Sequence, residues 1–215
     1  MTKSVENSPV PLLGVPLLAV LISGRGSNLQ ALIEAERDGR LGGRIAVVVS
    51  NRPGVEGLER ARAAGIDMVV VPHGEFASRE DYDRAIVAEL RRRQIALVCL
   101  AGFMRLVSSA FCDAFPHAIL NIHPSLLPAF PGPDAQRQAL EHGVKVTGAT
   151  VHLVTPELDA GPIILQEAVS VRNGDSVESL SARILEVEHR LYPEAVRRVI
   201  SGGWRLEGRR FVHEG

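Results

Sequence analysis

Three polar residues of this chain carry side chains that together could catalyse the transfer of an acyl group. Asn121 and His123 stand two residues apart, and Asp159 follows further along the chain. An amide can donate a hydrogen bond to a developing oxyanion, an imidazole can move a proton, and a carboxylate can orient the imidazole. A carboxylate close to His123 would also favour the imidazolium, so we expect Asp159 to raise the pKa of His123.

The chain around these residues is suited to hold them in place. Asn121 and His123 end a predicted extended segment, so their side chains emerge on the same side of it. Pro124 and Pro128 follow, which predicts a rigid, extended exit from the strand. Asp159 lies in a predicted loop between two strands, where a carboxylate could face a site or close a turn.

A second candidate site is the glycine-rich segment Gly24–Leu29, which lies between a predicted strand and a predicted helix. Its backbone N–H groups and the helix N-terminus would hold an anion such as a phosphate. In the alternative interpretation the glycines serve only a turn, and Ser27 or Asn28 caps the helix. A dinucleotide site is disfavoured, because Leu29 takes the place of the third glycine and Ser50-Asn51 that of an acidic residue.

The sequence lacks the residue patterns that covalent catalysis and metal catalysis require. Ser125 is not in a Gly-x-Ser-x-Gly turn and neither Cys99 nor Cys112 has a nearby base, which disfavours a covalent nucleophile. The two cysteines lack metal-site spacing, so we expect no metal and two buried free thiols in a reducing cytoplasm. His152 alternates with apolar residues on a predicted strand and is assigned no role.

Length and charge limit the classes of protein further. The chain has 215 residues, of which 46% are hydrophobic, and a net charge of −1. This composition is ample for a buried core and offers no field that would attract nucleic acid or an anionic membrane. The apolar run Leu12–Ile22 is shorter than the about twenty residues that a membrane-spanning helix needs.

Short apolar runs alternate with amphipathic ones along the first part of the chain. Strands are predicted at Leu17–Ile22, Ile45–Ser50, Met68–Val71, Ala96–Ala101 and Ala118–Ile122. Helices are predicted at Asn28–Arg37, Gly57–Ala64, Ser78–Arg93 and Ser108–Phe115. This order predicts an α/β fold, a doubly wound and mostly parallel sheet with helices on both faces.

The second part of the chain has longer elements. Val146–Val154 and Ile163–Val171 are predicted strands, and Ser176–Ser201 is a predicted long helix in which Pro193 is a candidate kink. We expect residues 1–15 to form a disordered tail and residues 16–215 to form a single domain.

Taken together, these motifs resemble the phosphoribosylglycinamide formyltransferases, a family of folate-dependent enzymes with a Rossmann-like fold. Many matches in the same order make the resemblance specific. It runs from about Leu18 to Leu206 and includes Ile22–Gln30, Gly57–Ala61, Ser78–Glu80, Tyr82-Asp83, Leu100–Arg105, Asn121–Pro128, Glu157–Asp159, Gly161-Pro162, Glu188-His189 and Tyr192-Pro193.

The resemblance implies transfer of a formyl group from 10-formyltetrahydrofolate to the glycine amine of 5-phosphoribosylglycinamide, in de novo purine (IMP) biosynthesis. It implies neither a metal nor an acyl-enzyme. His123 would supply or shuttle a proton, Asn121 would donate to the formyl oxygen, and Asp159 would hold His123 charged. The implied partners are the two small-molecule substrates, without nucleic acid or membrane, and the implied protein is a cytoplasmic monomer or homodimer.

The same resemblance implies two groups of binding residues. The ribonucleotide phosphate would be held by Gly26, Ser27 and Asn28, and the same substrate would be contacted by Glu188. Folate would be contacted by Arg79, Met104, Arg105, Leu106, Val107 and Asn121, with a loop of Thr155, Pro156, Glu157, Leu158 and Asp159 closing over its pterin end.

Three positions depart from the family pattern. Leu185 stands where relatives usually have Gln or Lys, so one polar contact to the ribonucleotide is replaced or missing. Asp134 stands where relatives usually have a histidine, which changes the expected charge balance around Asp159. Pro133 is also unexpected and would stiffen its loop.

Three other functions share parts of this pattern. A formyltetrahydrofolate deformylase would use water instead of the amine, but those hydrolases usually have two adjacent histidines where this chain has His123-Pro124. A methionyl-tRNA formyltransferase would need an RNA-binding appendage and a basic surplus. A non-catalytic folate or phosphosugar sensor would not need all of Asn121, His123 and Asp159.

Overall fold

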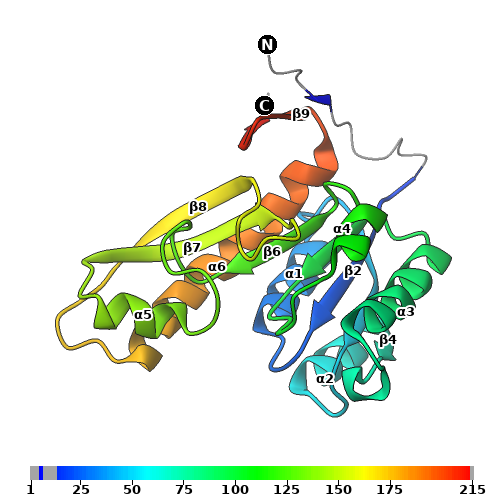
Figure 1. The fold of residues 1–215 in the computed structure, drawn as a ribbon, viewed down its shortest axis with the longest axis horizontal. Helices are drawn as coiled ribbons and strands as arrows, with labels where there is room; N and C mark the ends of the chain where they lie inside the picture. Colours follow the sequence, from blue (N-terminus) through cyan, green and yellow to red (C-terminus); the bar gives the residue numbers. More distant parts are fainter. Residues whose placement is uncertain (1–4, 7–13, 214–215) are drawn as a thin grey trace.

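The computed structural model describes residues 5–6 and 14–213 (Figure 1). Their strands form a single ten-stranded sheet in the order β1-β9-β10-β8-β7-β6-β5-β2-β3-β4. Most of the tail expected over residues 1–15 lies outside the described residues. Within it, β1 (Val5–Glu6) pairs antiparallel with β9 (Trp204–Glu207). The division into a tail and one domain stays a prediction.

Five neighbouring strands form the parallel part of the sheet that the sequence predicts. Their bounds are β2 Leu17–Ile22, β3 Arg44–Ser50, β4 Asp67–Val70, β5 Leu97–Leu100 and β6 Ile119–His123. They lie in the order β4-β3-β2-β5-β6, and each pairing among them is parallel. The predicted α/β fold class is therefore confirmed.

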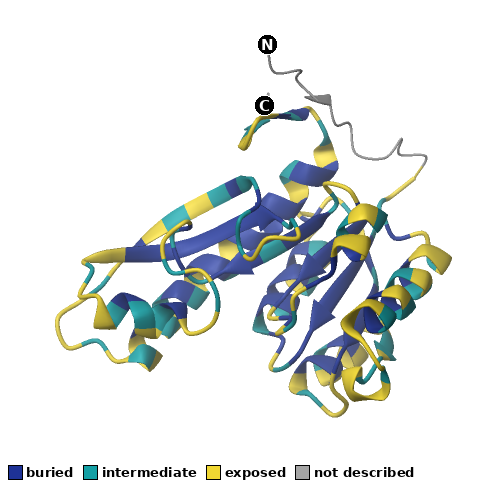
Figure 2. Ribbon diagram, in the orientation of Figure 1, coloured by how far each residue is buried: buried dark blue, intermediate teal, exposed yellow. Residues whose placement is uncertain are grey.

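Helices cover both faces of this parallel part, and β2 shows why. Leu18 and Val20 face the core that includes helices α1 (Ser27–Arg37) and α6 (Val177–Ser201), whereas Ala19 and Leu21 face the core against α3 (Arg79–Arg92) and α4 (Ser109–Ala114). Side chains of a strand alternate between its faces, so a strand buried on both faces must be apolar throughout. The other helices are α2 Glu56–Ala63, η1 His73–Glu75, α3 Arg79–Arg92 and α4 Ser109–Ala114. Figure 2 shows the buried strands between helices with exposed outer sides.

The second part of the chain extends the sheet with antiparallel strands. β7 (Val146–Leu153) pairs with β6 and with β8 (Ile163–Ser170), and the pairing with β6 places His152 opposite Asn121. The long helix α6 (Val177–Ser201) begins after the capping residue Ser176 and continues through Pro193. Both predicted strands and the predicted helix are present.

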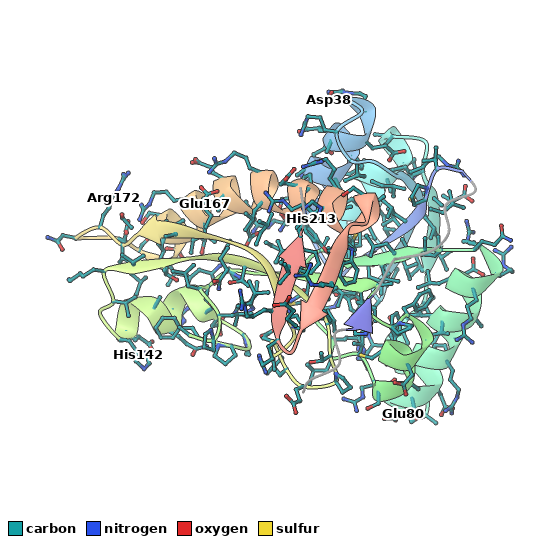
Figure 3. All side chains as sticks on the ribbon, turned by 90° about the horizontal axis from the view of Figure 1, so that it is seen from above. Asp38, Glu80, His142, Glu167, Arg172 and His213 are labelled. Atoms are coloured by element: carbon teal, nitrogen blue, oxygen red, sulfur yellow. The ribbon has the colours of Figure 1, made fainter. Side chains whose placement is uncertain are left out.

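Short elements were not predicted. They are β1, η1, α5 (Ala135–Glu141), β9 and β10 (Arg210–His213). The equally short β5 was predicted because all four of its residues are apolar, whereas β9, β10 and α5 mix polar with apolar residues over too few positions to show a pattern. The β9–β10 hairpin is stabilised by stacking of Trp204 on Phe211, with ring centroids 5.0 Å apart. Figure 3 shows His213, in the last strand of this hairpin.

The strand order reverses between β2 and β5, and the loops that leave these two strands are joined. The N–H group of Ser23 donates to the carbonyl of Gly102 at 3.2 Å. The hydroxyl of Ser23 accepts from the N–H group of Met104 at 2.9 Å. Ligands of doubly wound folds bind beyond the carboxyl ends of the strands at such a reversal. The glycine-rich segment, residues 103–107 and the end of β6 all lie at this edge.

Candidate active site

The structure brings together the three residues whose chemistry opened the sequence analysis. Asn121 and His123 lie at the end of β6, and Asp159 lies in the loop between β7 and β8. His123 Nδ1 is 3.5 Å from Asp159 Oδ2, and Asn121 Nδ2 donates to Asp159 Oδ1 over 3.5 Å. His123 is 5% exposed, so these charges meet in a largely buried place.

A fourth residue, His152, belongs to the same cluster and has no role in the sequence-based prediction. Its Nε2 atom lies 3.2 Å from Asn121 Nδ2 and 3.6 Å from Asp159 Oδ1. Its Nδ1 atom is 2.9 Å from the carbonyl oxygen of Leu153, which can only accept. In the neutral ring Nε2 is therefore the acceptor and receives a hydrogen bond from Asn121.

The two N–H bonds of the Asn121 amide are thus directed at His152 and at Asp159. Only the pairing of β6 with β7 places His152 opposite Asn121. In the sequence, His152 is one polar position in an alternating strand, and such a position is often just a satisfied core histidine. Pairing the two predicted strands in this register would have placed His152 opposite Asn121 and so revealed its role.

The tautomer of His123 follows from its second nitrogen. Nε2 is 2.8 Å from the carbonyl oxygen of Phe130, so Nε2 carries the hydrogen in the neutral ring. Nδ1, which faces Asp159, is then the nitrogen that gains or loses a proton. The carboxylate of Asp159, 3.5 Å away, can stabilise the charge that Nδ1 gains when it takes up a proton.

Asp159 raises the pKa of His123, as predicted, but the net shift is downward, so the expectation that His123 is held charged is wrong. Burial lowers this pKa below its usual value, and this effect outweighs the opposing contributions of the Phe130 carbonyl and of Asp159, while His152 lowers it slightly further. Asp159 does favour the imidazolium, in the predicted direction. The prediction failed because sequence gave no measure of how completely the ring is buried, and burial disfavours the charged form.

Asp159 is held in one orientation. Its backbone is in the left-handed region, with φ 48°, and its Oδ2 accepts from the N–H group of Gly132 at 2.8 Å. Burial by itself would raise the pKa of Asp159, but the contact with His152, the hydrogen bond from the Gly132 N–H group and the nearby imidazole of His123 bring it below its usual value. The carboxylate is therefore charged at neutral pH.

The departure at Asp134 does not touch this cluster. Asp134 occupies the position before α5 with φ 56°. Within residues 14–213, no hydrogen bond or ion pair joins its side chain to Asp159. Charge balance around Asp159 is set by His123, His152 and the Gly132 N–H group instead.

The glycine-rich segment forms an open helix N-terminus. Gly26 precedes α1 with φ 69°, and α1 has neither a side-chain cap nor an acidic residue in its first turn. A Cβ atom on Gly26 would lie 2.7 Å from the Cα atom of Gly57, so glycine is required here by close packing as well as by φ. The predicted alternative, a helix capped by Ser27 or Asn28, is not what the structure contains.

Asn28 and Glu188 lie together beside this helix N-terminus. Asn28 Nδ2 donates to Glu188 Oε2 at 2.7 Å, and both residues are buried. Burial raises the pKa of Glu188 to about 7, against a smaller lowering by Asn28. The Oδ1 atom of Asn28 is buried and has no hydrogen-bond partner among the residues that the structure describes, so it can accept from a ligand.

The anion site and the polar cluster lie at the same edge of the sheet. The first follows β2 and the second ends β6, with β5 between them. Two strand spacings separate them by about 10 Å. A single ligand with a phosphate at one end and a reactive group at the other could reach both.

The residues expected to contact folate fall into three places. The segment Met104–Val107 follows β5 and exposes apolar surface, with Met104 72% exposed and Leu106 50% exposed. Arg105 lies over the ring of Tyr82, with its guanidinium carbon 4.9 Å from the ring centroid.

The expected loop over the pterin includes Leu158, which is 48% exposed. Leu158 Cδ2 lies 3.6 Å from where a Cβ atom of Gly132 would be. Arg79 begins α3, exposed, with its guanidinium 3.4 Å from Glu80; no contact in the described part of the chain joins it to the other expected folate residues.

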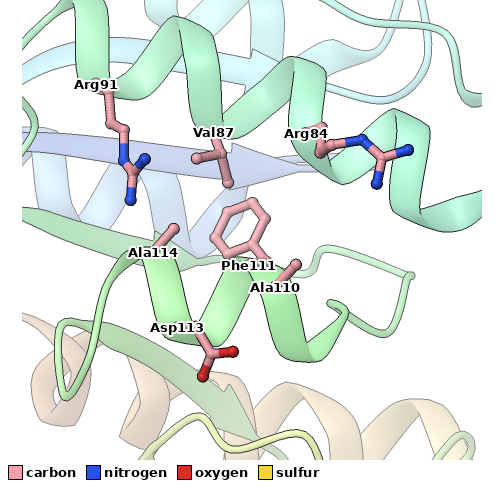
Figure 4. A pocket seen from close by; sticks show the side chains of 7 residues that line it. All are labelled: Arg84, Val87, Arg91, Ala110, Phe111, Asp113 and Ala114. Carbon is pink, nitrogen blue, oxygen red and sulfur yellow. The ribbon is translucent and has the colours of Figure 1, made fainter.

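A groove of about 340 Å³ between α3 and α4 is a separate feature (Figure 4). It contains none of the expected site residues. Its lining residues are Arg84, Val87, Arg91, Ala110, Phe111, Asp113 and Ala114.

Further properties bear on the class of protein. In the described ranges, no helix is long and apolar enough to cross a membrane. Across the same residues, no group of three or more His, Cys, Asp or Glu side chains is arranged to hold a metal ion. Both cysteines are free, and Cys99 is fully buried, which raises its pKa to about 12.

Fold and site together define a doubly wound α/β protein with a buried amide, imidazole and carboxylate cluster at the carboxyl edge of its sheet. The formyl transferase family model matches residues 17–196. The chain belongs to this family. The predicted resemblance is confirmed.

Individual relatives agree with this assignment. The chain is 46% identical over 197 residues to the phosphoribosylglycinamide formyltransferase of Escherichia coli, covering 92% of this chain and 90% of that protein. It is 51% identical over 185 residues to the trifunctional purine biosynthetic protein adenosine-3 of Gallus gallus, but spans only 18% of that protein and 86% of this chain. The crystal structure of glycinamide ribonucleotide transformylase 1 from Symbiobacterium toebii is 53% identical, with a TM-score of 0.92, over 97% of this chain and 100% of that one.

Proposed function

We propose that this protein transfers the formyl group of 10-formyltetrahydrofolate to the glycine amine of 5-phosphoribosylglycinamide, a step of de novo purine biosynthesis. The observation that carries the proposal is the buried cluster of Asn121, His123 and Asp159, about two strand spacings from an uncapped helix N-terminus. A formyltetrahydrofolate deformylase is the second candidate. The names of the relatives favour the transferase.

The proposed reaction needs one oxyanion donor and one proton carrier. As the substrate amine adds to the formyl carbon, Asn121 donates to the formyl oxygen, which replaces the long 3.5 Å contact of its amide with Asp159. His152 keeps the other N–H bond of the amide in place at 3.2 Å. The amide is thereby oriented before the substrates arrive.

His123 carries the proton in this scheme. Its lowered pKa leaves Nδ1 free to take the proton that the attacking amine loses. Asp159 is charged and stabilises the imidazolium that results. His123 then gives the proton to the leaving nitrogen of the folate as the bond from that nitrogen to the formyl carbon breaks, so that protons balance over the cycle.

The ribonucleotide would be bound at the helix N-terminus. Gly26, Ser27 and Asn28 present N–H groups at the start of α1, where the helix dipole favours a phosphate. Glu188 would contact the same substrate from α6 and orient Asn28 through their 2.7 Å hydrogen bond. Leu185, one turn earlier on α6, cannot supply a polar contact.

The folate would lie across the exposed apolar residues on the other side of the cluster. Met104, Leu106 and Leu158 provide surface for its rings. The remaining proposed contacts are Arg79, Arg105, Val107, Asn121, Thr155, Pro156, Glu157 and Asp159.

The wider setting follows from the same proposal. Two free thiols fit a reducing cytoplasm. The partners would be the two small molecules, and the protein would be a monomer or a homodimer. Neither a metal nor a nucleic acid has a part in the scheme.

One assay tests the proposal against its rival. Purified protein is mixed with glycinamide ribonucleotide and 10-formyltetrahydrofolate, and each substrate is omitted in turn. A transferase forms tetrahydrofolate and the N-formyl ribonucleotide only when both are present. Release of formate at the same rate without the ribonucleotide would identify a deformylase, and binding without turnover would identify a sensor.

A further inference from the structure

A row of polar residues crosses the antiparallel strands beside the active-site cluster. His123 on β6 lies opposite Thr150 on β7, and Thr150 lies opposite Gln166 on β8. Directly opposed residues of neighbouring strands point to the same face of a sheet. Polar side chains are costly to bury without partners, so each of these needs a specific set of hydrogen bonds.

Those bonds hold the backbone that follows His123. The Thr150 hydroxyl donates to the carbonyl of Ser125 at 2.6 Å and accepts from the N–H group of Leu127 at 3.1 Å. Gln166 Nε2 donates to the same hydroxyl at 2.9 Å and to the carbonyl of Leu127 at 2.8 Å. These bonds use every donor and acceptor of the Thr150 hydroxyl and both N–H bonds of the Gln166 side-chain amide. They fix residues 125–127 to β7 and β8.

Ser125 extends the network to the turn that touches the imidazole. Its hydroxyl is completely buried and donates to the carbonyl of Ala129 at 2.5 Å and to that of Phe130 at 3.3 Å. Phe130 has φ 54°, a conformation that a bulky residue rarely adopts without support. The Phe130 carbonyl is the acceptor of the His123 Nε2–H group at 2.8 Å.

We propose that Ser125 and Gln166 are positioning residues that fix the Nε2–H tautomer of His123, by holding the Phe130 carbonyl against the ring. Neither residue needs to touch a substrate for this. The inference deepens the proposed function, because it explains why Nδ1 is the nitrogen that faces Asp159. If the Phe130 carbonyl moved away, the ring hydrogen could sit on Nδ1, and Nδ1 could not then accept the proton of the amine.

The direct test is ¹⁵N NMR of the histidine rings in the full-length protein, with His123 assigned from a His123→Gln variant. Wild type is expected to show the Nε2–H tautomer alone at a pH above the titration of His123. In Ser125→Ala, the Nδ1–H tautomer should become detectable. In Gln166→Met, which removes two hydrogen bonds farther from the ring, its population should be smaller.

Kinetics supply a second measurement. We expect kcat to fall about tenfold in Ser125→Ala, the loss that follows when one net hydrogen bond of about 1.4 kcal/mol no longer orients the base. KM for the ribonucleotide should stay within about twofold, since the network does not reach α1. The acid limb of the kcat profile should move to lower pH, because the Phe130 carbonyl raises the pKa of His123 while Asp159 and His152 face the same ring unchanged.

Ser201→Ala is the matched control, because Ser201 also donates to a carbonyl, that of Arg198 at 3.0 Å, at the far end of α6. It should change neither the tautomer nor kcat. An unchanged tautomer in both test variants overturns the inference, whatever happens to kcat. If the tautomer changes in the variants but the wild-type protein does not transfer a formyl group, the positioning role is supported and the proposed function is excluded. The inference and the proposed function can therefore fail separately.

Discussion

Asn121 and His152 face each other across strands β6 and β7, with the amide nitrogen of Asn121 3.2 Å from Nε2 of His152. This contact directs one N–H bond of Asn121 at His152 and leaves the other near Asp159, where the proposed reaction would use it for the formyl oxygen. An oxyanion donor works only when it is oriented before charge develops.

Replacement of His152 therefore tests the orientation of Asn121. His152→Phe keeps a ring in the buried position but removes the acceptor. We expect kcat to fall by about 10- to 100-fold, part of the roughly 10²–10³ that one oxyanion donor supplies. Steady-state kinetics measure it, and an unaltered kcat would show that Asn121 does not depend on His152.

His123→Ala removes the proposed proton carrier. Turnover should fall by about 10²–10⁴, the typical contribution of a positioned acid or base. Ribonucleotide affinity, measured by calorimetry, should stay nearly the same, because α1 and Glu188 lie two strands away. A variant with near-normal kcat would remove His123 from the mechanism.

Asp159→Asn separates the charge of this residue from its shape. Asp159 raises the pKa of His123 against the larger lowering by burial, so its neutralisation should lower that pKa further. The acid limb of the kcat profile should shift to lower pH, and kcat itself should fall, because the imidazolium loses its counter-ion. The pH–rate profile measures the shift; no movement of the limb would contradict the electrostatic link.

Ser27→Ala probes the anion site. Ser27 is the first residue of α1, which has no side-chain cap. Loss of a hydrogen bond to a charged phosphate, about 1.5–3 kcal/mol, should raise KM for the ribonucleotide by about 10- to 100-fold. KM for the folate serves as the internal control, and a defect confined to the folate would place the phosphate elsewhere.

Glu188→Gln should alter how stability depends on pH. The pKa of Glu188 is raised to about 7 in the folded protein by burial. A carboxyl with a raised pKa contributes stability below its unfolded pKa, and this contribution is lost as pH rises through 7. The melting temperature of wild type should therefore fall relative to that of Glu188→Gln between about pH 4.5 and pH 8. If the melting temperatures of the two proteins changed equally with pH across that range, the raised pKa of Glu188 would be contradicted.

Much of the parallel half could be predicted, because its strands are apolar on both faces and apolar residues recur every three to four positions along its helices. The strand predicted at Leu17–Ile22 has those bounds in the structure, and the helix predicted at Ser78–Arg93 differs by one residue at each end. Capping residues mark such helix ends locally, as Ser78 does through its bond from Asp81 N–H at 3.0 Å. The short α5, β9 and β10 were missed because, unlike the equally short β5, they mix polar and apolar residues.

The chemical identities of Asn121, His123, Asp159 and the glycine-rich segment could be read from the sequence, because catalysis demands particular residue types. Tertiary structure decided the rest. Strand pairing brought His152 and Thr150 into the row beside β6. Burial reversed the expected direction of the pKa of His123. Both depend on neighbours far apart in the chain, and local sequence carries no record of the distance or desolvation that folding imposes between them.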